Sequence, residues 1–129
     1  MTPTRVGWVR AAYVLLADLI GVVVFALAGR GAHGEGTGAG AVALTAWPFL
    51  VGCLLSWAAV RAWREPLRPR TGGALVIGTV LVGHVLRVLT GGTTHWSFIL
   101  VSIIALTVLL VGWRLVAGVI LRRRRSPAR

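Results

Sequence analysis

Acidic residues, lysine and cysteine are rare or missing in this sequence of 129 residues. Asp18, Glu35 and Glu65 are its only acids, every basic side chain is arginine, and Cys53 is its single cysteine. One cysteine excludes an intramolecular disulfide. The three acids are too far apart for a paired-carboxylate mechanism, and no serine, threonine or cysteine has an evident base beside it. We therefore expect no catalytic residues and no enzyme activity.

Apolar residues make up most of what is present. They account for 57% of the chain, and the mean hydropathy is +0.83, whereas roughly 45–50% apolar residues is typical of soluble domains. A net charge of +11 would suggest nucleic acid as the partner of a soluble protein. Here, however, the arginines fall between long apolar runs, where topology signals belong. We therefore expect an integral membrane protein, with the lipid bilayer as its surroundings and no nucleic-acid partner.

Charged residues divide the chain into four apolar pieces, each near the length that a helix needs to cross a hydrocarbon core about 30 Å thick. The expected spans are residues 11–29, 40–60, 73–90 and 96–121, followed by a basic cytoplasmic tail at 122–129. The first run is longer than the usual core of a signal peptide, so we expect it to be retained. Short connections favour antiparallel neighbours. The predicted fold is all-α, a single transmembrane domain over residues 1–129 built as an up-down bundle of four transmembrane helices.

The arginine positions predict an orientation. Twelve of the 14 arginines, Arg114 among them, flank the chain ends and the link between the second and third spans, and only Arg30 and Arg87 lie toward the other side. The positive-inside rule then predicts a multi-pass protein of the cell membrane with both termini cytoplasmic. The run Arg122, Arg123, Arg124 and Arg125 is expected to anchor the last helix and attract anionic lipid, with a partner-binding tail as the alternative. Tryptophans mark the expected interfaces: Trp8, Trp63 and Trp113 inside, Trp96 outside.

Asp18 is the most informative residue, because it lies within the first expected span. A carboxylate at the centre of a span costs about 2.5–3.5 kcal/mol on insertion, so it should face the bundle interior with a partner or be protonated. His84 and Arg87, three residues apart, share one face of the third span and are the expected partners. Asp18, His84 and Arg87 thus form a predicted intramembrane polar cluster. It either fixes helix packing or provides a proton or ion path.

A glycine-rich stretch between the first two spans carries Arg30, His33 and Glu35 and is a candidate outer site. Its letters fit G-x-G-x-x-G, but a dinucleotide site needs a preceding strand and a parallel sheet, which a membrane helix does not supply. His33 and Glu35, with His95 from the other outer loop, could contact a metal, but no further ligand completes the set. We predict a mobile loop with no metal and no cofactor, and keep a ligand-contacting loop as the alternative.

Small residues at four-residue spacing predict where helices approach closely. They are Ala17 with Gly21, Pro48 with Gly52 and Ser56, and Thr79 with Gly83. Pro48 also lacks an amide hydrogen and crowds the preceding turn, which predicts a kink in the second span.

Several segments together resemble a known family. They are Asp18, Phe25 to Arg30 (FALAGR) followed by His33, Thr45 to Phe49 (TAWPF), and Trp57 with Arg61, Ala62 and Trp63. With Leu86, Arg87 and the segment Gly112 to Arg114, the resemblance covers roughly residues 18–118 and points to a family of small actinobacterial membrane proteins catalogued as a domain of unknown function. The resemblance implies a four-helix integral membrane protein and contributes no activity.

Three classes of function remain open from the sequence. The first is a structural or accessory membrane protein that assembles with itself or with a larger partner. The second is a small proton-coupled transporter or channel, with Asp18 as proton site, His84 as relay and Arg87 as gate or anion contact. The chain is similar to the small multidrug exporters in having a first-helix acid and four spans, but its uneven arginine distribution argues against their antiparallel dimers. The third, a membrane-embedded enzyme, lacks a nucleophile and a metal set.

Overall fold

The computed structural model describes residues 4–32, 34, 36 and 38–125. In this part of the chain all regular structure is helical, which confirms the predicted fold class. The elements are α1 (Arg5–Ala32), α2 (Ala39–Ala59), the short 3-10 helix η1 (Ala62–Arg64), α3 (Pro69–Leu89), α4 (Trp96–Leu106), the π-helical segment η2 (Thr107–Val111) and α5 (Gly112–Arg125). Because α4, η2 and α5 follow without a break, they form one rod.

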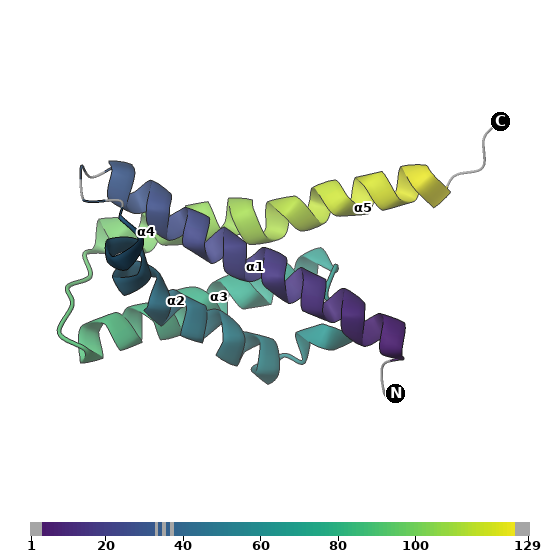
Figure 1. Ribbon diagram of the computed structural model, residues 1–129, viewed down its shortest axis with the longest axis horizontal. Coiled ribbons are helices and arrows are strands. Elements are labelled where there is room, and N and C mark those ends of the chain that lie inside the picture. Colours follow the sequence, from purple (N-terminus) through teal and green to yellow (C-terminus); the bar gives the residue numbers. More distant parts are fainter. Residues whose placement is uncertain (1–3, 33, 35, 37, 126–129) are drawn as a thin grey trace.

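Four helices in the described residues are long and apolar enough to cross a membrane: α1, α2, α3 and the α4–α5 rod. Figure 1 shows that they run up and down, with both chain ends and the α2–α3 link at one end. We call this the proximal end, and the end with the α1–α2 and α3–α4 connections the distal end. The helices extend beyond the expected apolar spans: α1 starts at Arg5, and Pro69 opens α3, since a first-turn proline needs no amide partner.

The predicted close-approach faces are confirmed where α2 meets α3. A Cβ atom on Gly52 would lie 3.0 Å from the carbonyl oxygen of Thr79, and one on Gly83 would overlap the ring of Phe49. Gly21 of α1 packs in the same way, with the position of its missing Cβ 3.3 Å from Leu110 Cδ2. At Gly52 the two backbones approach because glycine leaves room for them, whereas at Gly83 and Gly21 a neighbouring side chain occupies that room. Helix α2 continues through the buried Pro48, and the kink stays a prediction.

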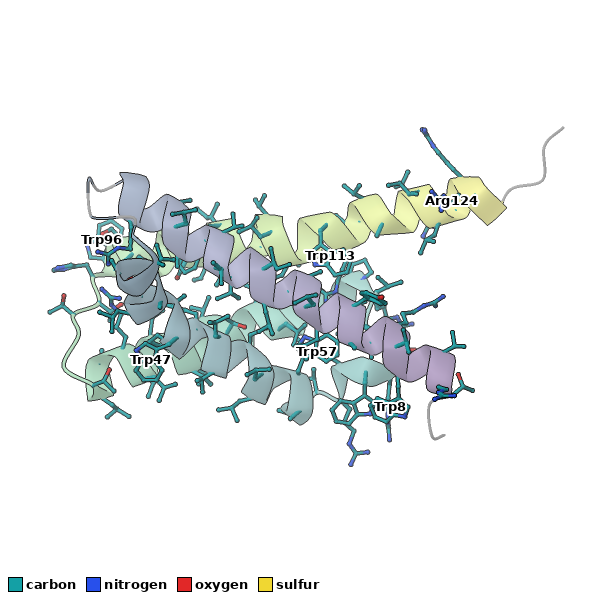
Figure 2. All side chains as sticks on the ribbon, in the orientation of Figure 1. Trp8, Trp47, Trp57, Trp96, Trp113 and Arg124 are labelled. Carbon is teal, nitrogen blue, oxygen red and sulfur yellow. The ribbon has the colours of Figure 1, made fainter. Side chains whose placement is uncertain are left out.

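Side chains on the outside of the bundle are largely apolar, as Figure 2 shows along the rods. Leu44, Ile77 and Leu81 are 73%, 71% and 64% exposed, on two different helices. Water would disfavour so much exposed apolar surface, whereas lipid tails match it. The pattern is the one expected of helices that face a bilayer.

Candidate functional site

Asp18 lies on α1 and its side chain is completely buried. Its carboxylate accepts a bidentate ion pair from Arg114, with Nη1 2.7 Å from Oδ1 and Nη2 2.6 Å from Oδ2. The indole Nε1 of Trp57 donates to Oδ2 at 2.9 Å, and that of Trp113 donates to Oδ1 at 3.0 Å. Each oxygen therefore accepts two hydrogen bonds, which fills the acceptor capacity of a carboxylate.

Arg114, on α5, is as buried as its partner and is anchored on two further sides. Its Nε donates to the carbonyl of Pro66 at 2.7 Å, and its Nη1 also donates to the carbonyl of Leu110 at 2.7 Å. The guanidinium carbon lies 4.9 Å from the ring centroid of Trp113, a cation–π contact. This buried centre, defined by Asp18, Arg114, Trp57 and Trp113, joins α1, α2, the α2–α3 link and α5.

The local backbone explains how a long arginine fits into this core. Just before it, the chain widens into the π-helical turn η2, in which the amide of Gly112 donates to the carbonyl of Thr107 five residues earlier. Such turns often occur at functional positions. On α3, Gly72 makes room: a Cβ atom there would lie 3.0 Å from Arg114 Cδ and 3.2 Å from the Leu110 carbonyl oxygen.

The expected partners of Asp18 are thereby corrected. Asp18 pairs with Arg114, not with His84 or Arg87, and no hydrogen bond within the described residues joins it to either of them. Arg114 and Trp113 were both expected at the inner interface, yet they complete the buried centre. A sequence signal did exist: Arg114 lies inside the expected span 96–121, where its charge needs a partner of opposite sign. Counting it as a topology marker concealed that signal.

His84, on α3, is buried nearer the distal end and belongs to a separate hydrogen-bond chain. Its Nε2 is 2.9 Å from Ser102 Oγ, and its Nδ1 is 2.6 Å from Thr94 Oγ1. Since the Ser102 hydroxyl donates to the carbonyl of Ile99 at 2.7 Å, it accepts from His84, and Thr94 then donates to Nδ1. The tautomer assigned in this way has its proton on Nε2. The chain ends at a helix carbonyl, so the histidine ties α3 to α4.

Arg87 lies one turn beyond His84, and the connection that follows α3 holds the Arg87 side chain in place. Its Nε donates to the carbonyl of Thr93 at 2.7 Å, and its guanidinium carbon is 5.0 Å from the ring centroid of Phe98. The chain reverses there through Gly91, at φ 90°, with the amide of Gly91 bonded to the carbonyl of Val88 and that of Gly92 to the carbonyl of Arg87. These two bonds form a Schellman cap, which requires a left-handed residue at Gly91.

The buried side chains between the two polar groups are mostly apolar, although Thr79 and Cys53 are among them. Val22 on α1, Leu106 on α4 and Leu75 on α3 are all fully buried and belong to one apolar core. The buried centre and the His84 chain are therefore two separate structural ties, one toward each end of the bundle.

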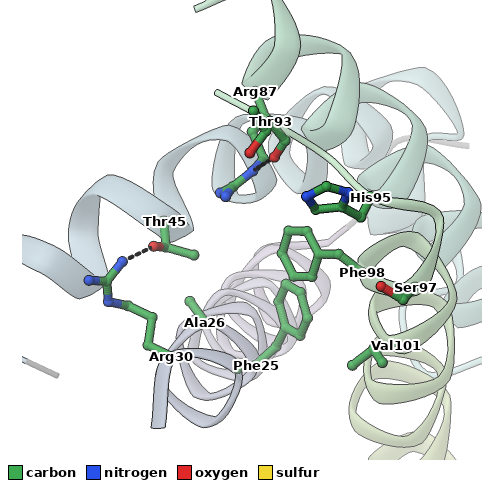
Figure 3. A pocket seen from close by; sticks show the side chains of 11 residues that line it. Phe25, Ala26, Arg30, Thr45, Arg87, Thr93, His95, Ser97, Phe98 and Val101 are labelled. Atoms are coloured by element: carbon green, nitrogen blue, oxygen red, sulfur yellow. Dashed lines mark hydrogen bonds between the residues drawn. The ribbon is translucent and has the colours of Figure 1, made fainter. Parts of the chain in front are cut away.

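The distal end contains a cavity of about 320 Å³, shown in Figure 3. We call it the distal cavity. Its polar lining comes from Arg30, Thr45, Arg87, Thr93, His95 and Ser97, and its apolar lining from Phe25, Ala26, Phe98 and Val101, with Gly29. Arg30 Nε donates to the carbonyl of Gly36 at 2.5 Å and its Nη1 donates to Thr45 Oγ1 at 2.8 Å.

The other predicted loop residues, His33 and Glu35, lie outside the described residues. Within the residues that are described, no three metal-ligating side chains come together. Among the candidate loop residues, Arg30 alone can be placed, and it lines the distal cavity together with Arg87 of the expected intramembrane cluster.

Comparison with known proteins identifies the family. Residues 15–117 match the model of a family described as "Protein of unknown function (DUF3054)", and the chain belongs to this family. No curated protein and no solved structure matches the chain. The match agrees with the family resemblance carried by the sequence segments, and it brings no assigned activity.

Proposed function

We propose that this chain is a structural or accessory membrane protein that assembles with itself or with a larger membrane partner, and that it is not an enzyme. The observation that carries this proposal is the state of Asp18. A carboxylate that cycles a proton needs an open oxygen and a route for exchange. Asp18 has no exposed surface, and both of its oxygens already accept two N–H groups each.

The geometry supports a packing role for the only acid within a span. Bidentate arginine–carboxylate pairs are among the strongest and most directional hydrogen-bonded contacts in proteins. Breaking such a buried pair by removing one partner costs about 3–5 kcal/mol. One contact of this kind joins α1 to α5. The hydrogen bond from Trp57 to the same carboxylate connects α2 to them. Asp18 then serves to fix which faces of the helices meet.

A surface for a partner is available on α5. This helix diverges from the rest of the bundle toward the C-terminus in Figure 1, and Leu115, Val116 and Val119 on it are 53%, 60% and 50% exposed. The helix ends in the basic run, for which we propose anionic headgroups of the cytoplasmic leaflet as the partner. Both termini would then be cytoplasmic, in the cell membrane, and the apolar face of α5 would meet a second copy or a larger partner.

A small proton-coupled transporter or channel is the second candidate, because a polar cavity exists at the distal end. Its expected path would run through Asp18, His84 and Arg87, but no hydrogen bond among the described residues connects the buried centre with the His84 chain. This separation supports the structural role over transport.

Proton flux in liposomes separates the two candidates. We expect vesicles with the wild-type chain to show the same flux as empty vesicles under an imposed pH gradient. Wild-type flux above that background would overturn the proposal, and its loss in Asp18→Asn would assign the route to the buried centre.

Chemical cross-linking in native membranes tests the proposed assembly. We expect products that contain a second copy or a larger protein. A chain that stays monomeric and unlinked would refute assembly.

A further inference from the structure

We propose that the distal cavity binds the phosphate group of an anionic phospholipid, with the first part of an acyl chain lying along its apolar side. This inference is independent of the structural role proposed above. It rests on how the cavity separates charge from apolar surface.

The charged side of the cavity suits a phosphate. Arg30 comes from α1 and Arg87 from α3, so two arginine side chains line the same space from different helices. The Arg30 guanidinium is already bonded to the carbonyl of Gly36 and to Thr45, so Arg87 is the group that we expect to meet the phosphate. Figure 3 shows the Arg87 guanidinium extending between Thr45 and the ring of Phe98. In the part of the chain that the structure describes, neither Nη atom of Arg87 has a hydrogen-bond acceptor, although its Nε is bonded to Thr93. Guanidinium groups match phosphate oxygens in a bidentate manner, and no described lining residue is acidic.

The other side of the cavity is apolar and reaches the surface that faces lipid. The rings of Phe25 and Phe98 stack with their centroids 6.0 Å apart, and Ala26 lies beside them in Figure 3. Val101, which completes this side, is 46% exposed on the outside of α4. A chain that enters from the bilayer can therefore meet the aromatic pair without crossing the bundle. A free phosphate would leave this side of the cavity unfilled.

Position and size agree with a lipid. The cavity lies at the ends of the spanning helices, where lipid phosphates are found. A volume of about 320 Å³ is at the lower end of the range of roughly 300–1,000 Å³ for ligand pockets, enough for a headgroup phosphate and the start of a chain. The carbonyl of Thr93 and the hydroxyl of Thr45 hold the two arginine side chains before any ligand arrives, which lowers the ordering cost of binding.

Thermal unfolding of the purified chain in detergent tests the assignment. A ligand that binds the folded state stabilises it by an amount that grows with the logarithm of the ratio of ligand concentration to Kd, and the unfolding temperature rises with it. Titration with short-chain phosphatidylglycerol therefore gives an apparent affinity. We expect Arg87→Gln to weaken that affinity about tenfold or more, because it removes charge-assisted hydrogen bonds. Arg70→Gln, which removes the same charge from the proximal end, should leave the affinity unchanged. Val101→Trp should weaken binding without any change in charge, since it fills the apolar side.

The control ligands identify the source of the phosphate. We expect little stabilisation from inorganic phosphate alone, and less from phosphatidylcholine than from phosphatidylglycerol. If inorganic phosphate reproduces the full effect, the assignment to a lipid is wrong. Equal losses in Arg87→Gln and Arg70→Gln would show nonspecific attraction to a basic protein, and would overturn the site. The absence of any lipid-dependent shift in the wild type would overturn it as well. If Arg87→Gln does not fold, Val101→Trp decides: unchanged affinity refutes the proposal.

Discussion

Replacing Arg114 by glutamine is the sharpest test of the buried centre. The change removes the two hydrogen bonds that Nη1 and Nη2 donate to Asp18 and leaves that carboxylate buried with only the indole groups of Trp57 and Trp113. Hydrogen bonds to charged groups contribute about 1.5–3 kcal/mol each, so two of them amount to roughly 3–6 kcal/mol. Breaking a buried ion pair by removing one partner costs about 3–5 kcal/mol. The two approaches agree on a loss of about 4 kcal/mol of unfolding free energy.

The coupling between Asp18 and Arg114 gives the prediction its specificity. Asp18→Asn should cost a similar amount, because it leaves the Arg114 charge uncompensated at 1% exposure. The double variant, Asp18→Asn with Arg114→Gln, places two neutral amides opposite each other and should lose much less than the sum of the single changes. We expect a coupling energy of about 3 kcal/mol, within the range observed for residues in direct contact.

Reversible unfolding in mixed micelles, followed by tryptophan fluorescence and circular dichroism, measures these free energies. Trp57 and Trp113 contact the carboxylate directly, so two of the six tryptophans that contribute to the fluorescence report on the site. Single variants that each cost under about 1 kcal/mol and combine additively would show that the pair is solvated, and would refute the account of the site. Recovery in the double variant also distinguishes loss of the pair from a general failure to fold.

Three further predictions concern two substitutions and the orientation of the chain. Gly72→Ala should destabilise the chain by about 1–3 kcal/mol, because the added Cβ would lie 3.0 Å from Arg114 Cδ. The control Gly73→Ala, whose added Cβ meets nothing within 4 Å, should be neutral or stabilise by up to about 1 kcal/mol in the same assay. Equal effects of the two changes would contradict the packing of Gly72 against Arg114. Thr79→Val should leave the unfolding free energy unchanged or raise it by about 1 kcal/mol, because the buried Thr79 hydroxyl meets only the weakly hydrogen-bonding thiol of Cys53 among the described residues. A loss above about 1 kcal/mol would show that this contact stabilises the fold. Reporter fusions at the C-terminus should be active in the cytoplasm, and periplasmic activity would reverse the proposed orientation.

The number and approximate limits of the helices follow from the sequence, because they depend on local properties. Charges interrupt the apolar runs, and each run has the length of a membrane-spanning helix. Small residues at four-residue spacing also marked the α2–α3 contact, since the size of a side chain is visible in the sequence. The burial of Asp18 was predictable for the same reason: a charge in lipid has to be satisfied.

The partner of Asp18 was decided only by the tertiary structure. The sequence places Asp18, His84 and Arg87 inside expected spans, but it does not say which of the charged groups face one another. The direction in which a side chain points depends on helix rotation, and the π-helical turn η2 adds one residue just before Arg114. One residue turns a helix by about 100°, enough to move a side chain from the lipid to the core. No local pattern in the apolar segment Thr107 to Val111 announces that turn, because it exists through the contacts of Arg114 with α1 and the α2–α3 link.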